Sequence, residues 1–116
     1  MYRYDLSTRR GETFHEEIII KSGNAPLALT GATAKSQIRP KAGSDILTKE
    51  VTCSVDGSAG KVTMELTAEE TMSIPAGKYQ YDLLIQRGTE IRYYIGGSFT
   101  VEASVTVMED EGGENA

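Results

Sequence analysis

The stretch Gly77–Ile85 constrains the fold more than any other part of this 116-residue sequence. Its every second residue is aromatic or aliphatic, namely Tyr79, Tyr81, Leu83 and Ile85. Successive side chains of an extended chain point to opposite faces, so this alternation gives one face that is almost wholly apolar. The pattern predicts a β-strand that lies at the centre of a hydrophobic core, with Leu84 on the opposite face.

The residues that lead into this strand predict a short helix. Thr67-Ala68-Glu69-Glu70 fits a capping box, and the helix is expected to run to about Ile74, where Pro75 stops it. A short helix followed by a Gly-x-Tyr-x-Tyr strand is typical of the E–F crossover of immunoglobulin-like sandwiches. There, a tyrosine hydroxyl binds upstream main chain. We expect Tyr79, which lies nearer the crossover, to make this bond.

Alternation along the rest of the chain predicts further strands. In strand 13–21 the inward residues are Phe14, Ile18 and Ile20, with Glu16 at a rim, and in strand 32–39 they are Ala32, Ala34, Ser36 and Ile38. The next inward face consists of Leu47, Val51, Cys53 and Val55. In strand 61–66 the inward residues are Val62, Met64 and Leu66. Strand 89–95 places Ile91, Tyr93 and Ile95 inward and Tyr94 outward, and Gly96-Gly97 separates it from Phe99, Val101, Val105 and Val107.

Seven or eight short strands with one helical turn predict an all-β fold, an immunoglobulin-like antiparallel β-sandwich or a small barrel. The predicted core consists of Phe14, Ile18, Ile20, Ile38, Val62, Met64, Leu66, Tyr79, Tyr81, Leu83, Ile85, Phe99 and Val101. The glycine pair Gly96-Gly97 is explained either by a strand break or by the close passage of another segment.

Charge divides the chain into a body and a tail. Glu109, Asp110, Glu111 and Glu114 follow Val107, and no basic residue does, so the net charge of −5 lies mostly in the tail. We expect one domain over residues 1–108 and a solvated, dispensable acidic tail over residues 109–116. A nearly neutral body gives no electrostatic footprint for nucleic acid or an anionic membrane as a partner.

The sequence contains no pattern of export or membrane insertion. The residues after Met1 form no apolar signal region, and no apolar run approaches the roughly 20 residues that span a bilayer. We therefore expect synthesis in the cytoplasm. The single cysteine, Cys53, falls on the apolar side of its strand and is predicted to be a buried, inert thiol.

Catalytic, cofactor and metal sites are not predicted. The single histidine, His15, lies on the outward face of its strand, and the chain holds too few His and Cys residues for a zinc site. Glu16 and Glu17 point to opposite faces, whereas Glu69 and Glu70 are explained by helix capping. No phosphate loop or dinucleotide fingerprint is present, so we expect no cofactor and no enzymatic activity.

The first eight residues form a possible extended arm. Tyr2, Tyr4 and Leu6 alternate with polar residues and would offer one short apolar face. Such a segment can fold back on its own sheet or reach the open edge of a neighbouring subunit. Tyr2, Tyr4 and Leu6 are therefore candidate assembly contacts, and a homo-oligomer is a possible outcome.

Six segments, in collinear order over roughly residues 9 to 107, resemble a family of small immunoglobulin-like proteins of phage tails and baseplates. That family includes the N-terminal domain of the baseplate upper protein. The matching segments are Arg10–Phe14, Pro26–Thr33, Gln37–Arg39, Gly60–Thr67, Pro75–Leu83 and Gly97–Val101. Glu12 departs from the aspartate of the family pattern, and residues 32–36 carry less bulk.

The resemblance implies a non-enzymatic phage or prophage structural module that acts in tail or baseplate assembly. Its partners would be other phage structural proteins, and its location the virion. Two alternatives come from the residues themselves. The first is a carbohydrate- or ligand-binding β-sandwich that uses exposed tyrosines such as Tyr94. The second is an adhesion or adaptor domain of a bacterial surface protein.

Overall fold

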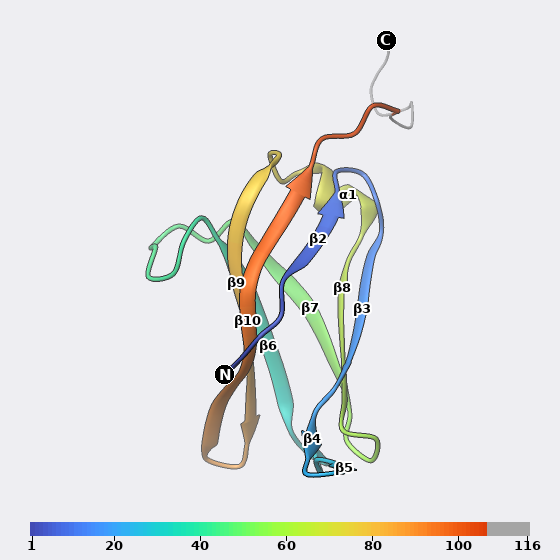
Figure 1. Cartoon of the computed structure of the whole chain (residues 1–116), viewed down its shortest axis with the longest axis vertical. Helices are drawn as coiled ribbons and strands as arrows, with labels where there is room; N and C mark the ends of the chain where they lie inside the picture. Colours follow the sequence, from blue (N-terminus) through green and yellow to red (C-terminus); the bar gives the residue numbers. More distant parts are fainter. Residues whose placement is uncertain (107–116) are drawn as a thin grey trace.

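A computed structural model describes residues 1–106 of the chain and shows an all-β fold with one short helix (Figure 1). The strands are β1 (Tyr2–Arg3), β2 (Leu6–Arg9), β3 (Phe14–Ile19), β4 (Lys21–Ser22), β5 (Ala25–Pro26), β6 (Thr33–Arg39), β7 (Lys49–Asp56), β8 (Lys61–Leu66), β9 (Gly77–Arg87) and β10 (Glu90–Glu102). The helix α1 spans Ala68–Met72. The all-β prediction is therefore confirmed.

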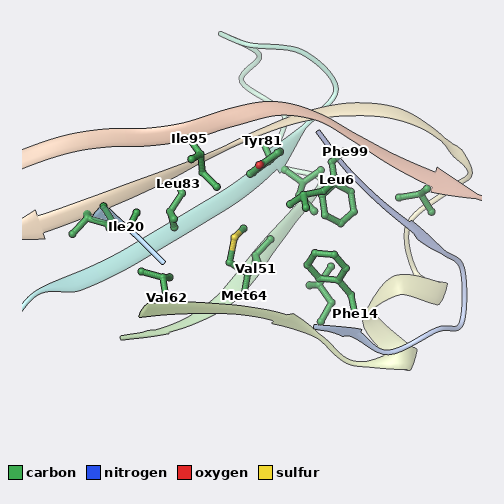
Figure 2. Packing of buried hydrophobic residues seen from close by; sticks show 14 of the residues in the cluster. Leu6, Phe14, Ile20, Val51, Val62, Met64, Tyr81, Leu83, Ile95 and Phe99 are labelled. Carbon is green, nitrogen blue, oxygen red and sulfur yellow. The ribbon is translucent and has the colours of Figure 1, made fainter. Parts of the chain in front are cut away.

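Most strands belong to one curled sheet with the order β1-β10-β9-β6-β7-β8-β3, and β2 also pairs with β10. The sheet folds over on itself at β7, whose first residues pair with β6 and whose later residues pair with β8. Figure 2 shows the two resulting layers with the core side chains between them. We call the part formed by β6, β9, β10, β1 and β2 the β9 layer, and the part formed by β3, β7 and β8 the β8 layer.

The core lies between these layers and agrees with the predicted inward faces. Predicted core residues that are buried are Phe14, Ile20, Ile38, Val62, Met64, Leu66, Tyr81, Leu83, Ile85, Phe99 and Val101, while Ile18 and Tyr79 are partly buried against them. Phe14 and Phe99 meet edge to face across the layers, with their ring centroids 5.2 Å apart. Leu29 and Ile74 are also buried, although no alternation pointed to them.

The crossover before β9 has the predicted local structure. The Thr67 hydroxyl accepts a hydrogen bond from the Glu70 amide, and the Glu70 carboxylate accepts one from the Thr67 amide, so the capping box is present. The Tyr79 hydroxyl donates to the Pro75 carbonyl oxygen at 2.6 Å. The expected bond between Tyr79 and the main chain near the helix is confirmed.

Strand β10 differs from the prediction in two ways. It is one continuous strand through Gly96-Gly97, so the predicted break is wrong. A bulge between Tyr93 and Ile95 adds one residue and reverses the faces before it. As a result Ile91 and Tyr93, predicted inward, are exposed, whereas Tyr94, predicted outward, packs against the core.

Two other predicted inward residues lie at the surface. Leu47 is exposed because it precedes β7, which begins only at Lys49 and takes its regular alternation from there. Val105 is exposed because β10 ends at Glu102 and, within residues 1–106, no strand pairs with the chain beyond it. Val107 and the predicted acidic tail 109–116 lie outside the described residues.

Candidate functional site

The N-terminal segment, residues 1–6, lies along β10 of its own chain. Tyr2 and Arg3 pair in parallel with Ile95 and Gly96, and the Tyr4 amide donates to the Gly96 carbonyl oxygen at 2.9 Å. From Leu6 onward, β2 continues the parallel pairing with β10. Within the single chain, the first of the two predicted arrangements is therefore the one adopted: the arm folds back on its own sheet.

The pair Gly96-Gly97 explains why the N-terminal segment can lie so close to β10. A Cβ atom added to Gly97 would lie 2.5 Å from Asp5 Oδ1 and 3.2 Å from the Tyr4 carbonyl oxygen. A Cβ atom at Gly96 would lie 3.0 Å from the end of the Met1 side chain. Real Cβ atoms essentially never lie 2.5 Å from another heavy atom, and contacts of 3.0–3.2 Å are tighter than most, so a side chain at either position would require the segment to shift. Close passage of another segment, rather than a strand break, therefore accounts for Gly96-Gly97.

The three candidate assembly residues do not share one face. Tyr2 is 80% exposed and Tyr4 is 42% exposed, whereas Leu6 is only 7% exposed and belongs to the core. The alternation is interrupted because β1 ends at Arg3 and β2 begins at Leu6. Tyr2 and Tyr4 are thus available to a partner, Leu6 is occupied within its own chain, and a role in assembly stays a prediction.

Hydrogen bonds connect the N-terminal segment to strands β3, β9 and β10. The Tyr4 hydroxyl donates to Glu16 Oε2 of β3 at 2.6 Å, and this hydrogen bond raises the pKa of Tyr4. The Tyr81 hydroxyl donates to the Tyr4 carbonyl oxygen, and burial raises the pKa of Tyr81. Asp5 Oδ1 accepts from the Ser98 amide at 3.0 Å, which lowers the pKa of Asp5.

Exposed apolar side chains gather around this segment. A hollow of about 660 Å³ is lined by Tyr2, Tyr4 and Ile19, among others, and a second of about 540 Å³ is lined by Met1, Tyr2, Ile91 and Tyr93. Tyr2 borders both hollows, so these side chains form one surface. We call it the N-terminal patch: Met1, Tyr2, Tyr4, Ile19, Ile91 and Tyr93.

Two unpaired strand edges flank the larger hollow. β1 and β3 are the two ends of the sheet order, so each pairs with a neighbour on one side only. Unpaired edges present main-chain N–H and C=O groups that another extended segment can bind. The combination of apolar side chains and open edges makes this surface suited to protein–protein contact.

The sequence pointed to this patch only in part. Ile19 lies between Ile18 and Ile20, whose inward positions already imply that its side chain points outward. Ile91 and Tyr93 were missed because the bulge in β10 has no signature in the local sequence. The same bulge turns Tyr94, the tyrosine named for the carbohydrate-binding alternative, toward the core and leaves Tyr93 exposed instead.

His15 and Cys53, whose side chains could act in acid–base or nucleophilic chemistry, do not belong to the N-terminal patch. His15 is exposed on the outer face of β3, where Nδ1 lies 2.9 Å from Glu65 Oε2 and Nε2 lies 3.3 Å from Glu17 Oε2. The hydrogen bonds to Glu17 and Glu65 raise the pKa of His15. Cys53 is half-buried, and desolvation raises its pKa to about 11, so its thiol is protonated near neutral pH and a poor nucleophile.

Within residues 1–106, no cluster of three or more His, Cys, Asp and Glu side chains has the arrangement of a metal site. The same part of the chain contains no helix long and apolar enough to cross a membrane.

Comparison with known proteins identifies a shared fold. No family model and no curated protein matches the sequence. Among solved structures, the chain is similar to the N-terminal domain of phage TP901-1 ORF48, with a TM-score of 0.54 and 11% sequence identity. The match covers 88% of this chain and 99% of that domain. At this level of identity, the likeness is one of fold.

Proposed function

We propose that this chain is a non-enzymatic structural module of a phage or prophage virion, which acts in tail or baseplate assembly. The observation that carries this proposal is the likeness to the N-terminal domain of phage TP901-1 ORF48, which extends over nearly the whole of that domain. The collinear segments that resemble phage tail and baseplate modules support it from the sequence.

The finer assignment of the fold to the immunoglobulin-like sandwiches belongs to the same proposal. Two observations support it. The Tyr79 hydroxyl binds the Pro75 carbonyl oxygen beside α1, as a tyrosine corner does. The chain also passes from β2, at the edge of one layer, directly to β3, at the edge of the other.

The N-terminal patch is the proposed contact with neighbouring proteins of the particle. Its members Tyr2, Ile19, Ile91 and Tyr93 are each at least half exposed, and open edges of β1 and β3 lie beside them. Burial of such side chains gives about 1.5–3 kcal/mol for each residue that becomes fully covered. A partner segment that also pairs with an open edge would gain main-chain hydrogen bonds and a defined register.

The virion assignment is tested on purified particles of the phage that encodes this chain. We expect an antibody against the protein to detect it in isolated tails and to label one fixed position on them in electron micrographs. Particles in which the major tail proteins are detected and this chain is absent would overturn the proposal.

The contact is tested with two matched variants in the same phage. Tyr2→Ser combined with Ile91→Ser changes the patch, whereas Ile46→Ser changes an exposed isoleucine in the loop before β7 and serves as the control. We expect tails to lose the patch variant and to retain the control. If both proteins are incorporated equally, the patch is not the contact.

A further inference from the structure

The two outer faces of the molecule carry opposite charge. On the outer face of the β9 layer, the exposed or half-buried basic residues Arg3, Arg9, Lys35, Arg39, Lys41 and Lys78 outnumber the acidic residues Asp5, Asp82, Glu102 and Glu50, the last of which lies on β7 beside Gln37. Lys35 and Arg39 lie on the outward side of β6, and Lys78 lies on the outward side of β9. Lys41 comes from the loop that follows β6.

A hollow in this basic face comes from the register of four strands. Gln37, Asp82, Gly96 and Arg3 lie directly opposite one another on β6, β9, β10 and β1. Gly96 adds no side chain to the row, and a hollow of about 470 Å³, which Met1 also lines, lies there. Arg39 and Lys41 border the hollow as well, so its rim is predominantly cationic.

The outer face of the β8 layer is acidic and flat. Its carboxylates are Glu17 on β3, Glu65 on β8 and Asp56 at the end of β7, all exposed. Between them lie small side chains in register, Thr63 opposite Ser54 and Thr52 opposite Glu65. The basic residues here are Lys61, whose Nζ lies 3.9 Å from Glu17 Oε2, and His15, whose ring nitrogens bond to Glu17 and Glu65.

The core separates these two faces, which therefore point away from each other (Figure 2). The near-neutral charge of the body thus conceals a segregation of charge between its sides. Two basic faces repel each other, as do two acidic faces, whereas a basic face attracts an acidic one.

From this arrangement we infer that a second copy of the chain binds with its acidic β8-layer face against the basic β9-layer face of the first. Such a contact joins two different surfaces, so the pair of copies keeps one free acidic face and one free basic face. A contact of this type repeats, and it closes into a ring or continues as a filament according to the rotation between neighbours.

The strength of the contact follows from its size. Three strands spaced about 4.8 Å apart, each about six residues long at roughly 3.3 Å per residue, cover only about 300 Å² of flat sheet. Stable interfaces cover about 800 Å² on each partner. The isolated protein should therefore associate weakly, at high concentration and low ionic strength, and a particle would add further contacts.

This inference does not depend on the phage assignment, and it differs from the N-terminal patch in its response to salt. A charged contact weakens as ionic strength rises, because the Debye length falls from about 10 Å at 0.1 M to about 3 Å at 1 M. An apolar contact does not weaken in this way. Salt dependence thus separates the two surfaces experimentally.

The test uses two charge-reversed variants of the full chain, each checked for native circular dichroism. The basic-face variant carries Lys35→Glu and Lys41→Glu, two exposed side chains outside the core. The acidic-face variant carries Glu17→Lys and Glu65→Lys. A control carries Lys21→Glu and Glu69→Lys, which leave both faces unchanged.

Sedimentation at concentrations up to millimolar gives the readout. We expect the wild type and the control to gain mass with concentration at low ionic strength and to lose this gain at about 0.5 M salt. Each face variant alone should stay monomeric. Their equimolar mixture should associate again, because the wild-type acidic face of one variant can then meet the wild-type basic face of the other.

Three results would overturn the inference. The first is a wild type that stays monomeric at millimolar concentration and low salt. The second is a face variant that associates as strongly as the wild type. The third is an equimolar mixture of the two variants that stays monomeric.

Discussion

The two layers of the sheet differ in how regularly their side chains alternate. In the β8 layer, inward and outward residues alternate without interruption, from Phe14 in β3 and from Val51 through β7 and β8. In the β9 layer, β6 and β9 alternate in the same way, but β10 contains a bulge and a glycine pair. The irregular strand is the one on which the N-terminal segment docks.

This difference shows where a sequence pattern predicts a face and where it does not. Strands of the β8 layer pair in a regular register, even where β3 meets β8 and Phe14 lies opposite Leu66, so their faces follow from burial alone. β10 also binds residues about ninety positions earlier in the chain. The bulge and the glycine pair of β10 lie where this distant segment pairs with the strand, and local alternation predicts neither of them.

The largest expected effect tests the regular pattern in β9. Leu83→Ala should lower the free energy of unfolding by about 2–5 kcal/mol, because Leu83 is fully buried in a central strand that cannot collapse into the cavity. Leu84→Ala, on the other face, should cost less than half as much. Chemical denaturation of both variants measures the difference, and equal losses would mean that the assigned register is wrong.

The second effect tests the irregular strand. Gly97→Ala should cost about 1–3 kcal/mol, since the added Cβ would force Asp5 and the main chain of Tyr4 away from β10. Gly77→Ala at the start of β9 is the matched control, because its Cβ would find only ordinary contacts with Tyr79, the nearest at 3.6 Å. If both substitutions are equally mild in thermal unfolding, close passage does not explain the glycine pair.

Much of the fold could be predicted from residue patterns. The capping box at Thr67, the bond from Tyr79 to the crossover and the inward faces of β3, β8 and β9 all depend on interactions within a few residues or on burial of one face. These signals are local, so they are visible in the sequence.

The candidate site could be predicted less well, for a physical reason. The exposure of Ile91 and Tyr93 depends on one extra residue in β10, and the burial of Leu6 depends on pairing with Phe99. Both are long-range features without a local signature. The charge on the two faces was likewise hidden, because the composition gives only the nearly neutral sum.

The third effect compares two tyrosines on the same face of β9. Tyr81→Phe should cost about 1–3 kcal/mol, since it leaves the half-buried Tyr4 carbonyl oxygen without its donor and loosens the N-terminal segment. Tyr79→Phe should cost only about 0.5–1.5 kcal/mol, because the Pro75 carbonyl oxygen lies at the surface.

Hydrogen exchange distinguishes the two variants further. In Tyr81→Phe, the amide of Tyr4 should exchange faster than in the wild type, whereas in Tyr79→Phe it should not change. Unaltered exchange in both variants would show that Tyr81 does not hold the segment in place.

The smallest expected effect lies on the regular β8 layer, where His15 and Glu65 face each other across β3 and β8. Hydrogen bonds to Glu17 and Glu65 raise the pKa of His15 in the folded state, so folding favours the protonated imidazole. This stabilisation is fully present below the unfolded-state pKa of about 6.5 and disappears as the pH rises through the higher folded-state value. Because the groups are exposed, the contribution should be small and sensitive to salt.

An NMR titration of the imidazole should give a pKa above that of an unfolded peptide. The stability advantage of the wild type over His15→Gln should shrink between pH 6 and 8. An advantage that grows over this range would reverse the assigned sign and would show that the two carboxylates do not hold the proton on His15.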